Sequence, residues 1–126
     1  MEKPPKIVRW SVSSRKELQS LPKDLRQLIG HDLWEVQLGK TPLTAKVLHG
    51  FGGGDVLEIR ANLGGSAFRA VYTVRFGDFV YVLHVFQKKS KKGSKTPPNI
   101  IDLIRKRLRK AEEDYESRKE KTDHTD

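Results

Sequence analysis

The sequence contains no cysteine, so disulfide bonds, thiolate metal ligands and thiol nucleophiles are all excluded. Its apolar runs are short, and none approaches the roughly 20 residues that a membrane-spanning helix needs. The opening residues MEKPPKIVRW lack the apolar core of a secretory signal. We therefore expect a protein of the cytoplasm that has no membrane partner.

Side chains that commonly catalyse reactions near neutral pH are scarce. The four histidines, His31, His49, His84 and His124, do not have the spacing of metal ligands. His84 lies inside an apolar run, which is more typical of a core histidine than of a catalytic one. No Ser/His/Asp arrangement or carboxylate pair stands out, and glycines 52–54 lack the flanking features of a nucleotide-binding loop. We expect no metal or cofactor, and an enzyme built on this chain would work mainly with cations.

Positive charge, by contrast, is abundant. The 126 residues carry 25 Lys and Arg against 16 Asp and Glu, a net charge of +9 at pH 7. A small, strongly basic domain predicts a polyanionic partner, most often a nucleic acid. The alternative is a basic surface that only keeps the protein soluble.

Hydrophobic periodicity predicts an α+β protein with the element order β-α-α-β-β-β-α. Ser14 and Glu17 have the spacing of a capping box, which predicts the start of the first helix. The last three strands should form an antiparallel meander. The expected elements are a strand at 6–12, helices at about 14–20 and 22–38, a short extended piece at 46–49, strands at 55–62, 67–76 and 79–89, and a helix at about 97–117.

These elements predict one domain over residues 1–117, with a single modest core. The helices should pack on one face of a twisted sheet and leave the other face partly open. The segment 118–126 has no apolar residue and should be a disordered tail.

The expected open face carries Arg69 in the middle of a strand, where a buried and unpaired charge is costly. One interpretation is a cross-strand ion pair with Glu58. The other is a phosphate-binding arginine that Glu58 orients, because a guanidinium matches phosphate oxygens. Both can hold at once. If the faces are as expected, Arg60 and one of Lys88 and Lys89 converge with Arg69 at one end of the meander.

A run of five lysines follows the last strand: Lys88, Lys89, Lys91, Lys92 and Lys95. Such a run is often a solvated loop, and this alternative stays open. The functional interpretation divides the run. The first two lysines belong to the site, and the last three form a basic loop whose attraction to RNA weakens with salt.

Together, these segments resemble the RelE/ParE-like toxins of prokaryotic toxin–antitoxin modules, and most of all the HigB-like, phage-derived Gp49-like branch. The motifs that carry the resemblance are LEIR, FRAVY and LHVFQKKSKK…KTPP, within a match over about residues 6–116. The resemblance implies a RelE-like fold and a metal-independent, ribosome-dependent mRNA endoribonuclease. It also implies a cognate antitoxin, often a helix-turn-helix protein of the HigA-like kind.

The resemblance assigns roles to residues of this chain. Arg69 of FRAVY corresponds to the clamp on the scissile phosphate, and Lys88 and Lys89 to groups that stabilise the transition state or move protons. Lys46 corresponds to a basic residue ahead of the LEIR strand. Glu58 and Arg60 belong to the strand signature. Glu58, with Tyr72 and His84, is expected to support the site, whereas Arg60 and Lys46 are expected to bind RNA.

One departure from the ribosome-dependent members concerns the base-stacking tyrosine, which Thr96-Pro97-Pro98 replaces here. Phe86 or Tyr72 is expected to stack instead. The ParE branch of the same fold inhibits gyrase and has no nuclease activity, so the fold alone does not decide function. A non-catalytic gyrase inhibitor, a simple RNA-binding module and an inactive phage-derived domain remain as alternatives.

Overall fold

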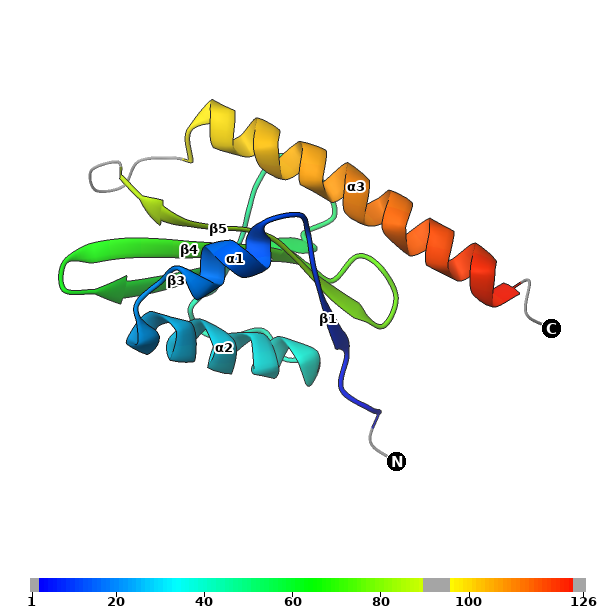
Figure 1. The fold of residues 1–126 in the computed structure, drawn as a ribbon, viewed down its shortest axis with the longest axis horizontal. Coiled ribbons are helices and arrows are strands. Elements are labelled where there is room, and N and C mark those ends of the chain that lie inside the picture. Colours follow the sequence, from blue (N-terminus) through cyan, green and yellow to red (C-terminus); the bar gives the residue numbers. More distant parts are fainter. Residues whose placement is uncertain (1–2, 90–95, 124–126) are drawn as a thin grey trace.

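A computed structural model describes residues 3–89 and 96–123, without the side chains of residues 122 and 123. The predicted α+β class is confirmed, and one strand is added to the expected order (Figure 1). The elements are β1 (Ile7–Trp10), α1 (Ser14–Gln19), α2 (Lys23–Gln37), β2 (Ala45–Val47), β3 (Val56–Leu63), β4 (Ser66–Thr73), β5 (Phe79–Lys88) and α3 (Pro98–Asp123).

The strands form one five-stranded sheet in the order β1-β5-β4-β3-β2. β3, β4 and β5 are the predicted meander, since each pairs antiparallel with the next. β1 lies parallel to β5 at one edge, and β2 lies antiparallel to β3 at the other. β2 corresponds to the short extended piece expected at 46–49. The Gly64-Gly65 turn joins β3 to β4, and both glycines have the positive φ that such a hairpin turn needs.

One face of the sheet packs against α2. The buried side of this helix presents residues at helical spacing to apolar side chains of the three meander strands. The cluster consists of Leu25, Ile29, Leu33 and Val36 from α2 and of Leu57, Ile59, Ala61, Phe68, Ala70, Tyr72, Val80, Val82 and Val85 from the sheet.

The opposite face is covered by α3, so the expectation that all helices share one face was wrong. Figure 1 shows α2 and α3 on opposite sides of the sheet. Alternate strand residues reach this second face, where Tyr81 and Leu83 of β5 would otherwise contact water. The second cluster consists of Val56, Val71, Phe76, Tyr81 and Leu83 with Ile104, Leu108 and Ala111 of α3.

α3 also ends later than expected, because it continues to Asp123. The predicted disordered tail was therefore wrong for residues 118–123. Arg118 donates from Nε to Asp114 Oδ2 at 2.9 Å, a contact between successive turns that supports a polar helix. Residues 124–126, and with them His124, lie outside the described residues. No helix in the described ranges 3–89 and 96–123 is long and apolar enough to cross a membrane.

Candidate functional site

The sheet register brings most of the predicted site residues onto the face that α3 covers. Directly opposed residues of antiparallel strands point to the same face. Lys46 opposes Glu58, while Arg60 opposes Arg69, which in turn opposes Phe86. These cross-strand pairs place cations from β2, β3 and β4 in neighbouring positions.

A cavity of about 520 Å³ opens on this face between the β2–β3 edge, the end of β5 and the start of α3. Three of its polar lining residues, Glu58, Arg60 and Lys88, were expected at the site. Its lining consists of Val47, Leu48, His49, Glu58, Arg60, Lys88, Thr96 and Ile101.

Glu58 holds both arginines through the same carboxylate oxygen, Oε1. Arg60 donates to it from Nε at 3.3 Å, and the Nε of Arg69 lies 3.5 Å away. The cross-strand ion pair considered for Arg69 is therefore present. Within the described part of the chain, the second Glu58 oxygen, Oε2, is buried and accepts no hydrogen bond. One carboxylate thus faces two guanidinium groups, and the cluster has an excess of positive charge.

The two arginines differ in their access to solvent. Only 9% of the Arg69 side chain is exposed, against 41% of that of Arg60. Burial lowers the pKa of Arg69, Glu58 acts against this shift, and the positive charge of Arg60 adds to it. Arg69 also donates from Nη1 to the carbonyl of Phe68 at 2.9 Å, which fixes its guanidinium. A ligand in the cavity would therefore meet Arg60 first, with Arg69 behind it.

The other expected cations stand in different positions. Lys88, the last residue of β5, is half-buried and lines the cavity. Lys89 and Lys46 are exposed, and neither belongs to the described lining. The expected basic loop of Lys91, Lys92 and Lys95 lies outside the described residues.

The two aromatic residues expected to stack on a base have separate positions. Phe86 is half-buried on the α3 face, where its ring stacks on His84 with centroids 4.8 Å apart. Tyr72 is buried in the opposite cluster under α2, and burial raises its pKa to about 12. The expectation for Tyr72 was therefore wrong, because its place in the strand alternation turns it to the other face.

His84 belongs to a polar network beside the site. The Glu17 carboxylate lies 3.1 Å from His84 Nδ1 and receives two hydrogen bonds from Arg107, at 2.9 and 3.1 Å. It also accepts the Val85 amide at 3.1 Å, in the part of β5 that extends past the end of β1. Glu17 therefore ties together α1, β5 and α3 and does not serve as a capping-box residue.

The environment of Glu17 explains its acidity. Burial raises the pKa of this carboxyl, but the hydrogen bonds from His84, Arg107 and the Val85 amide outweigh burial and lower it overall. Sequence reasoning missed both residues of this network, because Glu17 also fits a capping box and Arg107 also fits a solvated helix face. Only the pairing of distant elements brings them together.

The sequence placed His49 in a loop and assigned it no role, but the structure shows that it lines the cavity. Its loop is fixed to α3, since Arg105 donates to the Gly50 carbonyl at 3.1 Å and lies over the Phe51 ring. His49 therefore brings an imidazole to a cavity that also contains Arg60 and Lys88. In residues 3–89 and 96–123, no three His, Cys, Asp or Glu side chains gather as a metal site.

The fold and this cavity define a small, basic α+β protein with a cation-rich site on a sheet face. Residues 16–109 match the family described as phage derived protein Gp49-like (DUF891). The match covers most of the chain, which therefore belongs to the Gp49-like family.

Solved structures also include chains of similar fold. The chain is similar to a protein in the crystal structure of the toxin–antitoxin complex RelBE2 from Mycobacterium tuberculosis, with 18% sequence identity and a TM-score of 0.49. The similarity covers 67% of this chain and 99% of the other. No curated protein matches the chain at a significant level.

Proposed function

We propose that this protein is the toxin of a toxin–antitoxin module and cleaves messenger RNA on the ribosome without a metal ion. The observation that carries the proposal is a cavity on one sheet face that Arg60, Lys88 and His49 line, with the buried Arg69 opposite Arg60 in the sheet. Two further features support it: the resemblance of the LEIR and FRAVY motifs to HigB-like toxins and the net charge of +9.

The proposed reaction is an internal transfer of the phosphodiester. The ribose 2′-oxygen attacks the adjacent phosphorus and loses its proton, and the bond from phosphorus to the 5′-oxygen breaks. The leaving 5′-oxygen takes up a proton, so the products are a 2′,3′-cyclic phosphate and a free 5′-hydroxyl. Negative charge builds on the phosphoryl oxygens during this step, and fixed cations close to them stabilise it.

The geometry suggests separate roles for the cavity residues. Arg60 is the more exposed arginine and would bind the scissile phosphate directly. Arg69, held behind it by Glu58, would add fixed positive charge. Lys88 would approach the same phosphate from β5. His49 would move the proton, since an imidazole has two ring nitrogens that can accept and donate one.

The proposal implies partners as well as chemistry. A ribosome-dependent toxin acts in the cytoplasm on the message bound to the ribosome. A cell that encodes it also needs an antitoxin, which we propose to be a helix-turn-helix protein of the HigA-like kind.

Growth of cells that express the protein alone tests this proposal. The native chain should arrest growth, and the double variant Arg60→Ala/Lys88→Ala should relieve the arrest because both accessible cations are lost. The matched control is Lys23→Ala/Arg26→Ala, which removes two exposed charges from α2 on the other side of the sheet and should leave the arrest unchanged.

The outcome depends on the double variant being folded, which circular dichroism verifies. Full arrest by a folded Arg60→Ala/Lys88→Ala protein would contradict the proposed site. A DNA-damage response without message cleavage would instead favour gyrase inhibition of the ParE-like kind. RNA binding without any cleavage would favour a simple RNA-binding module.

A further inference from the structure

A second cavity, of about 620 Å³, lies between β1 and α3 and shares no lining residue with the candidate site. Residues 8–12 form one wall, and Leu103 and Ala111 of α3 belong to the other. Val8, Trp10 and Val12 are the apolar residues of the first wall, which also contains Arg9 and Ser11, and 72% of Val12 is exposed. The groove therefore offers exposed apolar surface at Val12.

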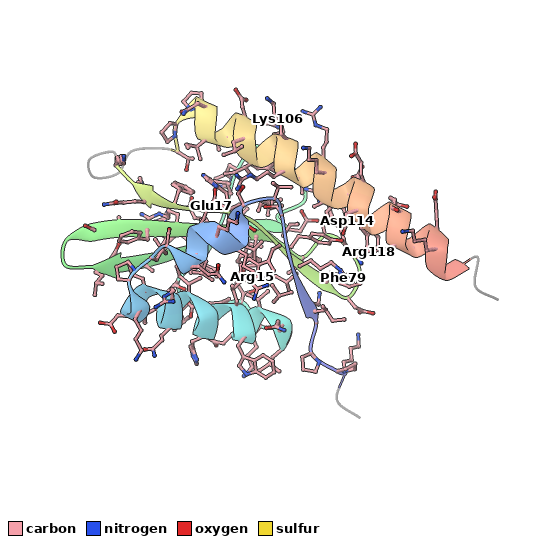
Figure 2. All side chains as sticks on the ribbon, in the orientation of Figure 1. Arg15, Glu17, Phe79, Lys106, Asp114 and Arg118 are labelled. Carbon is pink, nitrogen blue, oxygen red and sulfur yellow. The ribbon has the colours of Figure 1, made fainter. Side chains whose placement is uncertain are left out.

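Cations from two helices also line this groove. Figure 2 shows Arg15 on α1 and Lys106 on α3. Lys110 lines the groove one turn after Lys106. None of the three makes a hydrogen bond or ion pair within residues 3–89 and 96–123. Lys106 and Lys110 are four residues apart on one helix face, where like charges repel. An anion in the groove would relieve that repulsion.

The acidic residue of the groove, Asp114, already has partners. It accepts hydrogen bonds from the Tyr81 hydroxyl at 2.8 Å and from Arg118 Nε at 2.9 Å. Figure 2 shows Asp114 and Arg118 farther along α3 than Lys106. Asp114 is therefore not available to neutralise the lysines, and the groove retains its positive charge.

The edge of the sheet beside the groove is also open. The Ile7 amide donates to the carbonyl of Asp78, just before β5, and the Ser11 amide donates to that of Val82 in β5, so the alternating amides of Val8 and Trp10 point the opposite way. β1 is the last strand on this side of the sheet, and within the described residues these two amides have no acceptor. An unpaired edge of this kind can accept an added strand.

We propose that the groove binds an extended acidic segment of a partner protein, which adds as a strand to the open edge of β1. Carboxylates of the segment would pair with Arg15, Lys106 and Lys110, and alternate apolar side chains would cover Val12 and the groove wall. A single-stranded RNA would satisfy the cations but would leave the edge amides and the apolar wall uncovered. The inference does not depend on the proposed RNA cleavage.

Trp10 provides an optical probe of the groove. The chain has two tryptophans, so the Trp34→Phe protein reports from Trp10 alone. A synthetic peptide of about ten residues that alternates glutamate with valine matches the alternation of a strand. Titration with this peptide should produce a saturable change in Trp10 fluorescence.

Charge variants on the same Trp34→Phe background test the role of the cations. Lys106→Gln/Lys110→Gln should weaken peptide binding about tenfold, since each exposed ion pair contributes a modest share of the affinity. The matched control Lys23→Gln/Lys40→Gln removes two lysines outside the groove and should bind as before. Circular dichroism should show that both variants are folded. Equal binding by a folded Lys106→Gln/Lys110→Gln protein would overturn the groove as the site.

Two further ligands separate strand addition from other modes of binding. A peptide of the same sequence with alternate backbone amides N-methylated cannot pair with β1 and should lose its binding. If it binds as well as the parent peptide, strand addition is wrong. Oligouridine should bind this groove weakly or not at all. Strong, Lys106- and Lys110-dependent binding of oligouridine, with none of the peptide, would identify an RNA site and overturn the proposal.

Discussion

Glu58 organises the candidate site at the scale of single residues. Its carboxylate is almost buried and lies between one half-exposed arginine and one nearly buried arginine. A nearly buried guanidinium needs such a partner, because an isolated charge in that position loses its hydration without compensation. Glu58 therefore allows Arg69 to stay charged beside Arg60, although Arg69 does not itself line the cavity.

Replacing Glu58 by glutamine tests this role. The amide keeps the shape but removes the charge that Arg69 faces, so the free energy of unfolding should fall by about 1–3 kcal/mol. Arg60→Gln should change it by less than about 1 kcal/mol, because 41% of the Arg60 side chain is exposed and water screens its pairing with Glu58. Urea unfolding curves of the two variants measure the difference. Equal stability of Glu58→Gln and the native protein would show that Arg69 does not need Glu58.

Strand alternation was enough to predict most of the residues that share the site. LEIR and FRAVY show which side chains share a face, and this predicted Arg60 and Arg69 as neighbours, on a face that was expected to be open and that α3 in fact covers. Alternation does not tell how deep a side chain lies, so it did not distinguish the exposed Arg60 from the buried Arg69. His49 was missed because its position depends on Arg105 and the start of α3, which are distant in sequence.

At the scale of elements, α3 is the part of the fold that sequence reasoning placed least well. The nearly continuous apolar run of β5 indicated a strand covered on both faces, yet the helices were expected on one face only. The polar residues of β3 and β4 that mark the site share a sheet face with the apolar residues that pack against α3, so this face was taken to be polar. Its apolar residues come singly from separate strands, and no local periodicity therefore reveals them.

The bond network around Glu17 connects α3 to the sheet and makes stability depend on pH. The folded state lowers the pKa of Glu17 below its ordinary value of 4.5. Its contribution to stability is therefore complete above that value and is lost as the pH falls through the lower, folded-state pKa. Glu17→Gln should reduce the loss of stability below about pH 4.5. Unfolding free energies measured from pH 7 to pH 3 provide the comparison, and the exposed Glu113→Gln serves as control. An identical pH profile for Glu17→Gln would contradict the assignment.

The contact between α3 and the turn before β5 can be tested at Gly77. Its φ is +57°, and an added Cβ would lie 2.8 Å from the Tyr115 hydroxyl of α3. Gly64 has the same φ of +57° but nothing within 4 Å of an added Cβ. Gly64→Ala should cost only the left-handed backbone strain, about 1–2 kcal/mol. Gly77→Ala should destabilise the protein more than Gly64→Ala does, and thermal unfolding should show this as a larger drop in Tm. Equal drops in Tm for the two variants would show that α3 does not pack closely against this turn.

At the scale of the whole molecule, two surfaces with different chemistry occur on one small domain. The candidate site combines cations with an imidazole on a sheet face and suits a phosphodiester. The groove beside β1 combines cations with apolar residues and an open strand edge, and suits an acidic peptide. Each surface thus contains cations, and the net charge of +9 alone could not separate the two surfaces.

The most direct test of the proposed function is to map RNA 5′ ends in cells that express the protein. We predict new 5′-hydroxyl ends within translated reading frames after induction, because the 5′-oxygen is the leaving group. These ends should disappear in Arg60→Ala/Lys88→Ala and persist in Lys23→Ala/Arg26→Ala. Growth arrest without new 5′-hydroxyl ends, or ends that persist unchanged in a folded Arg60→Ala/Lys88→Ala protein, would contradict the account.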